Sequence, residues 1–167
     1  MKLIITIFIF TTTLLAMNNN FDLGMQYLLG NGKVIDKNKA MYYLTKAQQE
    51  GDAEATYNLA LMYYTGDGIK QDIKKAAELL DEAASKKFIK AIQNVGRVYM
   101  QLLNFEKAIY WLIKNAQNGD NQANYFLAEL YIAQGNLKMA KIYTEKAMGY
   151  GIKDAKNLWK EHKLFNY

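Results

Sequence analysis

Few side chains in this sequence could act as a nucleophile, a general base or a metal ligand. The 167 residues include no cysteine, one serine, Ser85, and one histidine, His162, near the C-terminus. Nucleophilic and acid–base catalysis need such groups within hydrogen-bond reach of one another. Ser85 is followed by Lys86, Lys87 and Phe88, so the Ser-x-x-Lys arrangement of penicillin-recognising enzymes is missing. We therefore expect no catalytic residue, no cofactor and no metal site.

Two glycine-rich segments raise the possibility of phosphate binding. They are Gly30-Asn31-Gly32 and Gly66-Asp67-Gly68. Neither ends in the Lys-Ser/Thr pair of a phosphate-binding loop, and neither follows a predicted strand. We interpret both as turns between helices, where glycine supplies a positive φ.

Composition and charge favour a helical protein that binds no nucleic acid. Proline is absent and 51% of the residues are hydrophobic, which suits uninterrupted helices around a core. Lysine and arginine number 21 against 16 aspartate and glutamate, and no run of five or more like charges occurs. Such alternating charges are typical of the solvated surfaces of helices rather than of a nucleic-acid stripe.

The first residues have the layout of a secretory signal. Lys2 precedes the apolar run Leu3 to Phe10, and Leu14-Leu15-Ala16 ends on a small residue suited to signal peptidase. We expect residues 1–16 to be removed and the remainder to be periplasmic or secreted. Two alternatives stay open: an uncleaved anchor that tethers the protein to the membrane, and a buried first helix.

Small residues recur at a nearly fixed spacing, which indicates a repeat. Those 36, 36 and 32 residues apart are Gly24, Ala60, Gly96 and Ala128. Three positions later stand Tyr27, Tyr63, Tyr99 and Tyr131. At helical pitch these series lie on one face, so each predicts the first helix of a unit.

A second series predicts the second helix of each unit. It consists of Ala40, Ala76, Ala108 and Ala140. Four positions before them stand Asp36, Asp72, Asn104 and Asn136, whose side chains suit the start of a helix. Seven positions after them stand Ala47, Ala83, Asn115 and Ala147, with Asn115 the exception. Gly51, Gly119 and Gly151 then stand where a left-handed helix end is expected, and Lys87 takes that place in the second unit.

The stretch Asn58 to Ala76, which contains Gly66-Asp67-Gly68 and the cap Asp72, resembles the Sel1-like repeat, and Leu23 to Ala40 matches it as well. The third and fourth units lack the Gly-x-Gly turn, and their shorter turn resembles that of a tetratricopeptide repeat. The resemblance implies an all-α, right-handed α/α solenoid of about four helix-turn-helix repeats. The expected units are residues 19–51, 52–87, 88–119 and 120–151 within a repeat domain of residues 17–167, closed by a capping helix in residues 152–167.

The resemblance also implies a bacterial scaffold or adaptor that binds a protein or peptide, with the first helices lining the binding side. Aromatic and arginine side chains are the usual anchors of such interfaces. The candidate contacts are Tyr57, Leu61, Tyr64, Gln93, Arg97, Met100, Tyr125 and Glu129. The alternative for each is core packing or ordinary surface. Because cysteine-rich secreted relatives are often labelled β-lactamases, a hydrolase of that type is kept as the alternative function, although no catalytic constellation supports it.

Overall fold

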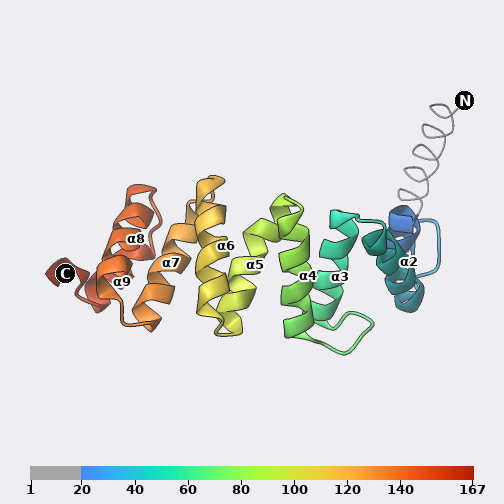
Figure 1. Cartoon of the computed structure of the whole chain (residues 1–167), viewed down its shortest axis with the longest axis horizontal. Helices are drawn as coiled ribbons and strands as arrows, with labels where there is room; N and C mark the ends of the chain where they lie inside the picture. Colours follow the sequence, from blue (N-terminus) through green and yellow to red (C-terminus); the bar gives the residue numbers. More distant parts are fainter. Residues whose placement is uncertain (1–19) are drawn as a thin grey trace, which may run out of the picture. The chain divides into compact units, whose positions relative to one another are not determined.

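The computed structural model describes residues 20–167, and the expected leader, residues 1–16, lies outside the described residues. The described part of the chain is helical throughout and contains no strand (Figure 1). Its first helical stretch is residues 20–29. The following elements are α2 Lys37–Gln49, α3 Ala53–Thr65, α4 Ile73–Ser85, α5 Ile89–Gln101, α6 Phe105–Gln117, α7 Gln122–Ala133, α8 Leu137–Gly149, α9 Ala155–Glu161 and the 3-10 helix η1 Leu164–Asn166.

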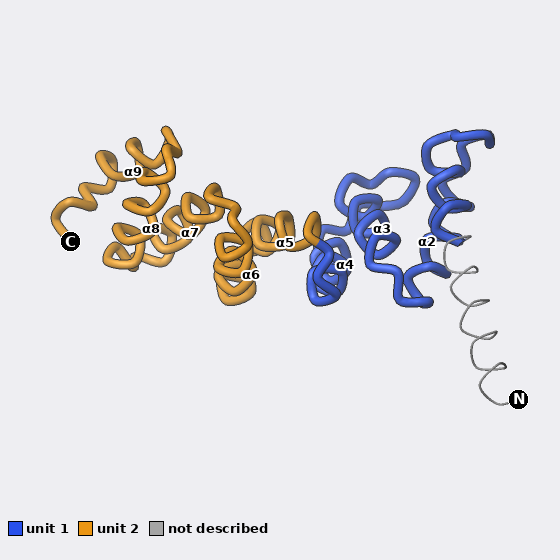
Figure 2. Tube along the Cα trace, turned by 90° about the horizontal axis from the view of Figure 1, so that it is seen from above, with its two compact units in different colours: residues 1–88 blue, residues 89–167 orange. Residues whose placement is uncertain are grey.

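The described helices form two compact units, residues 20–88 and 89–167 (Figure 2). In the first, residues 20–29 pair with α2, and α3 packs on both α2 and α4. In the second, α5 pairs with α6 and α7 pairs with α8, while α9 and η1 cover α8. These pairs confirm the prediction of an all-α repeat of helix-turn-helix units.

Side-chain caps start the second helix of every pair, as predicted. Asp36 accepts a hydrogen bond from the Lys39 amide, and Asp72 accepts one from the Lys75 amide. Asn104 and Asn136 do the same for α6 and α8. Each cap satisfies an amide that the helix itself leaves without an acceptor.

Close packing at the small residues holds each pair together. A Cβ added to Gly24 would lie 2.8 Å from Leu44 Cγ, and one added to Gly96 would lie 2.8 Å from Leu112 Cγ. The opposing side chain therefore fills the space that a larger residue would need. The four alanines that define the second helices are fully buried, which confirms the predicted apolar stripe.

Asn115 interrupts that stripe, and its neighbour Asp120 explains why a polar residue is tolerated. Asn115 is 3% exposed and donates from Nδ2 to Asp120 Oδ2 at 2.7 Å. Asp120 also accepts from the Gln122 amide at 3.0 Å, at the start of α7. A buried amide with a charged acceptor costs far less than an unpaired one.

The C-terminal cap is helical but shorter than expected. We predicted a capping helix in residues 152–167, whereas α9 ends at Glu161 and Lys163 has a φ of 47°. This left-handed residue redirects the chain so that Leu164 is fully buried against α8. The burial of one leucine side chain offsets the strain at Lys163. Trp159 on α9 is half-buried beside Lys141, whose Nζ lies 5.8 Å from the ring centre.

Lys87 gives a testable prediction. It has a φ of 65° at the position where Gly51, Gly119 and Gly151 end the other second helices. A non-glycine residue in the left-handed backbone conformation costs about 1–2 kcal/mol of stability. Replacing it with glycine relieves this strain, but the greater conformational freedom of glycine in the unfolded chain offsets about 0.5–1 kcal/mol of the gain. We expect Lys87→Gly to raise the free energy of unfolding in urea by up to about 1 kcal/mol.

The matched control is Gly51→Ala. Gly51 has a φ of 95°, and a Cβ added to it would meet no other atom within 4 Å. This substitution should lower the free energy of unfolding by about 1 kcal/mol. Equal effects of the two substitutions would contradict the account of these helix ends.

Candidate partner-binding surface

The eight candidate contacts lie on three first helices, at positions that share a helix face. Tyr57, Leu61 and Tyr64 are on α3 in the first unit. Gln93, Arg97 and Met100 are on α5, and Tyr125 and Glu129 are on α7, all in the second unit. Steps of three and four residues place each group along one side of its helix. We call these eight residues the first-helix face.

In the first unit only part of this face is open to solvent. Leu61 is 37% exposed, whereas Tyr57 and Tyr64 are half-buried. The Tyr57 ring packs against Phe88, with the ring centres 5.3 Å apart. The Tyr57 side chain therefore takes part in packing within the first compact unit and is only partly exposed to solvent. Core packing was the alternative interpretation of this candidate contact.

The second unit brings Arg97 and the α7 aromatic residues together. The Arg97 guanidinium lies 5.6 Å from the centre of the Phe126 ring, and Nη2 donates to Asn94 Oδ1 at 2.7 Å. Phe126 and Tyr125 are in an edge-to-face arrangement, with ring centres 5.8 Å apart. A guanidinium held over an aromatic face still has donors to offer a partner.

Sequence reasoning missed Phe126, although it is the residue that joins the Arg97 and Tyr125 sites. The available signal was its place beside Tyr125 in an aromatic pair. What the repeat spacing did not show is that Phe126 faces back toward α5. That contact depends on the packing of two helices and not on the pattern along one.

Tyr125 and Glu129 form a hydrogen-bonded pair one helical turn apart. Burial raises the pKa of the Tyr125 hydroxyl to about 12, and the hydrogen bond to Glu129 and its negative charge add to the effect. Asp154 and Glu161 contribute in the same direction. The Tyr125 hydroxyl therefore stays protonated to higher pH than an ordinary phenol and donates its hydrogen bond to Glu129.

Gln93 lies apart from this cluster, on a cavity within the second unit. The cavity has a volume of about 450 Å³ and includes Ile89, Asn115 and Asp120. Met100, the last candidate on α5, is half-buried. The structure thus groups Arg97, Tyr125 and Glu129 through Phe126, whereas no hydrogen bond or ring contact joins Gln93 or Met100 to that cluster within the described residues.

The residues considered for chemistry are spread over the surface. Ser85 is exposed at the end of α4, and His162 is exposed just after α9. Within residues 20–167 no three histidine, cysteine or carboxylate side chains converge as metal ligands would. The same part of the chain has no helix with the length and apolarity to cross a membrane.

The Gly66-Asp67-Gly68 turn, in the second repeat of the first compact unit, has a structural role. Lys37 Nζ donates to Asp67 Oδ2 at 2.8 Å and to the Leu28 carbonyl at 3.0 Å. A Cβ on Gly68 would collide with the Cβ of Lys37. Glycine thus lets the turn lie against the start of α2, which confirms its interpretation as a turn between helices.

Comparison with known proteins identifies the repeat. The family model described as Sel1 repeat matches residues 20–52, 53–88 and 90–120, more than half of the chain. The third match falls in the unit that lacks the Gly-x-Gly turn. The chain is 37% identical over 140 residues to an uncharacterized protein of Neisseria meningitidis, covering 79% of this chain and 29% of that protein.

Other similar proteins are longer as well. The chain is 31% identical over 100 residues to the alginate biosynthesis protein AlgK of Pseudomonas syringae pv. tomato, covering 58% of this chain and 21% of AlgK. This chain therefore spans less than a third of the length of each of these two curated relatives.

Two solved structures share the fold. A Sel1 repeat protein from Oxalobacter formigenes superposes with a TM-score of 0.68 at 26% identity, over 83% of this chain and 60% of that chain. A protective antigen of uropathogenic Escherichia coli with an SLR fold gives a TM-score of 0.62 at 22% identity, over 86% of this chain and 33% of the antigen.

Titration of Tyr125 tests the geometry of the α7 pair. We expect its ¹³Cζ resonance, assigned with Tyr125→Phe, to keep the position of a neutral phenol at pH 11. Since the folded pKa is raised above the unfolded value, the contribution of this group to stability is present below about pH 10 and is lost between about pH 10 and 12. Glu129→Gln should lower the pKa toward 10. A pKa near 10 in the unsubstituted protein would refute the pairing.

Proposed function

The chain belongs to the Sel1 repeat family, and from this premise we propose that it is an exported bacterial module that binds an extended segment of a partner protein through the first-helix face. Sel1 repeat proteins are helical scaffolds that mediate protein–protein interactions. Their helix pairs hold side chains on rigid elements, and the partner supplies the complementary segment.

The observation that carries the proposal is the cluster of Arg97 with the aromatic residues of α7. Arg97 is exposed, and its guanidinium is already ordered by Phe126 and Asn94. An ordered side chain loses less conformational entropy when a partner binds than a mobile one does. Tyr125 and Glu129 add a phenol hydrogen-bonded to a carboxyl group on α7, and their oxygens still have lone pairs to accept hydrogen bonds from a partner.

Export is supported by the residues themselves. Lys2, the apolar run Leu3 to Phe10 and the small residue Ala16 make the three parts of a cleavable signal. In this proposal the mature protein begins near Met17, and its repeat units act in the periplasm or outside the cell. An uncleaved leader would instead tether the same units to a membrane.

One experiment tests both parts of the proposal. The full chain carries a C-terminal tag, is produced in a Gram-negative host and is crosslinked in cells before purification. We expect a mature N-terminus near Met17 in the periplasmic fraction and a crosslinked partner. Replacing Tyr57, Arg97 and Tyr125 together with alanine should reduce capture of that partner at least tenfold, since such anchors carry most of the binding energy.

The matched control replaces Tyr42, Tyr110 and Lys114, which are exposed on second helices, with alanine. This control should capture the partner as the unsubstituted protein does. Unchanged capture by the Tyr57/Arg97/Tyr125 variant, with its helical circular dichroism intact, would overturn the proposed surface. An intact Met1 in the membrane fraction would overturn cleavage.

A further inference from the structure

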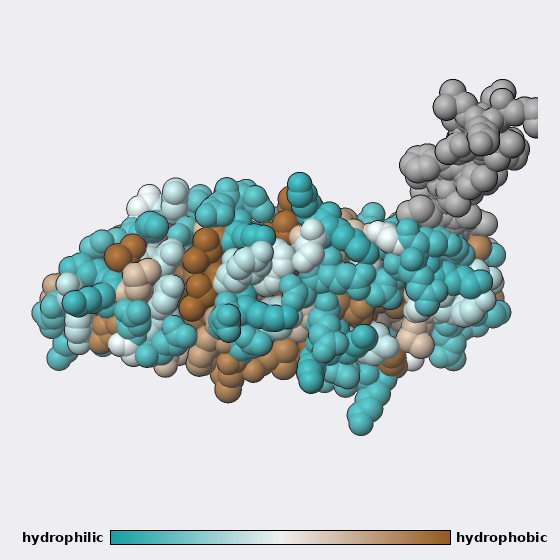
Figure 3. Space-filling view, in the orientation of Figure 1, coloured by the Kyte–Doolittle hydropathy of each residue, from teal (hydrophilic) through white to brown (hydrophobic). Residues whose placement is uncertain are grey.

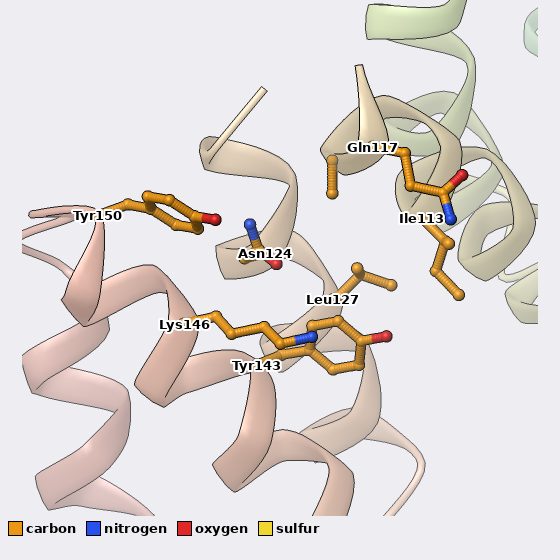
Figure 4. Close-up of a pocket in the computed structure, with 8 residues that line it drawn as sticks. Ile113, Gln117, Asn124, Leu127, Tyr143, Lys146 and Tyr150 are labelled. Carbon is orange, nitrogen blue, oxygen red and sulfur yellow. The ribbon is translucent and has the colours of Figure 1, made fainter. Parts of the chain in front are cut away.

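A pocket in the second compact unit is lined by the second helices of two pairs and by α7, but by none of the eight residues of the first-helix face. Its volume is about 310 Å³, and it is bounded by α6, α7 and α8 (Figure 4). Ile113, Leu127 and the ring of Tyr143 form its apolar walls. Apolar residues also interrupt the largely hydrophilic surface near α6 (Figure 3). We call this the α6–α8 pocket.

The polar groups in the pocket are mainly hydrogen-bond donors. Lys146 Nζ lies 4.8 Å from the centre of the Tyr143 ring, so the ammonium is held at the wall of the pocket. Asn124 is 6% exposed, and its Nδ2 donates to the Asn121 carbonyl at 3.3 Å, which leaves the second amide hydrogen for a ligand. The hydroxyl of Tyr150 points toward Asn124 (Figure 4).

No negative charge inside the pocket balances Lys146. The lining contains no aspartate or glutamate. Over residues 20–167 the ion pairs join other side chains, and none involves Lys146. An ammonium beside an apolar wall and a nearly buried amide therefore has room for an anionic group from outside.

The charge of the second unit favours an anionic ligand as well. Residues 89–167 contain eleven lysines and arginines and six aspartates and glutamates, a net charge of +5. Residues 20–88 contain nine basic and ten acidic residues, a net charge of −1. The pocket thus lies in the unit that attracts acidic partners.

From these observations we propose that the α6–α8 pocket binds a glutamate or aspartate side chain from an acidic segment of a partner protein. Lys146 pairs with the carboxylate, Asn124 and Tyr150 donate hydrogen bonds to it, and Ile113 and Tyr143 contact the apolar part of the segment. A single ammonium flanked by an amide and a phenol suits a carboxylate, whereas phosphate sites commonly use the bidentate fork of arginine.

This inference rests on the proposed role as a protein-binding module, but it uses a different face and a different test. The pocket is lined by α6, α8 and the Asn124–Leu127 side of α7, whereas the first-helix face uses Tyr125 and Glu129 on α7. Loss of one site therefore leaves the other intact. Binding of a synthetic acidic peptide by purified protein needs neither export nor the cellular partner.

Fluorescence anisotropy with a fluorescein-labelled decapeptide of alternating glycine and glutamate tests the pocket, and the glutamine version of the peptide serves as the neutral probe. We expect the glutamate peptide to bind and the glutamine peptide not to bind. Lys146→Gln should weaken binding at least tenfold, because it removes a charge-assisted hydrogen bond.

Lys46→Gln is the matched control. Lys46 occupies the same place in the first unit, six residues after the defining alanine, and its Nζ lies 4.6 Å from the centre of the Tyr42 ring. It lines no part of the α6–α8 pocket, so binding should change less than twofold. Equal weakening by the two substitutions would show general attraction to a basic surface and would overturn the proposal.

Asn124→Asp provides a second test with no change in side-chain size. A carboxylate on the pocket wall should repel the peptide and abolish binding while the helical circular dichroism stays the same. Binding of the peptide by Asn124→Asp or Lys146→Gln at the unsubstituted strength would refute the site.

Binding of polygalacturonate or of phosphatidylglycerol vesicles, with no binding of the peptide, would also overturn the assignment to a protein segment.

Discussion

The close approach of two helices at one small residue is the constraint on which the rest of the structure depends. Gly24 lies against Leu44, and Gly96 lies against Leu112, with no room for a larger side chain. In the other two pairs Ala60 and Ala128 are fully buried at the same position. The distance between paired helices decides which side chains reach across and which face solvent. The Arg97–Phe126 contact and the α6–α8 pocket are built on helices that belong to such pairs.

The two compact units share this packing but differ in charge. The first has nearly balanced charges, and at its α4 position Glu82 accepts hydrogen bonds from Lys86 and Gln48. The corresponding residues of α6 and α8 in the second unit are Lys114 and Lys146. Lys114 lies over Tyr110, and Lys146 lies over Tyr143. In the first unit α2 has Lys46 over Tyr42 at this position, so the second unit differs in having the lysine–aromatic pair on both of its second helices.

The sequence predicted the features that depend on spacing along one helix or on one turn. The caps Asp36, Asp72, Asn104 and Asn136 are examples, because a helix start needs only a few neighbouring residues. The role of Phe126, the end of α9 before Leu164 and the α6–α8 pocket were not predictable in this way. Each arises where residues from different elements meet, which a pattern along one helix does not encode. The role of the first-helix face in partner binding stays a prediction.

A double-mutant cycle between Gly96 and Leu112 tests most directly whether close approach holds the pairs together. In the unsubstituted background, Gly96→Ala places a Cβ against Leu112, and overpacking typically costs about 1–3 kcal/mol. A Leu112→Ala background removes the contacts with Cγ and Cδ2 and leaves only the one with the backbone nitrogen at 3.3 Å. Alanine favours a helix by about 1 kcal/mol over glycine. We expect Gly96→Ala to lower the free energy of unfolding in the first background and to raise it in the second. Equal effects in both backgrounds would contradict the account.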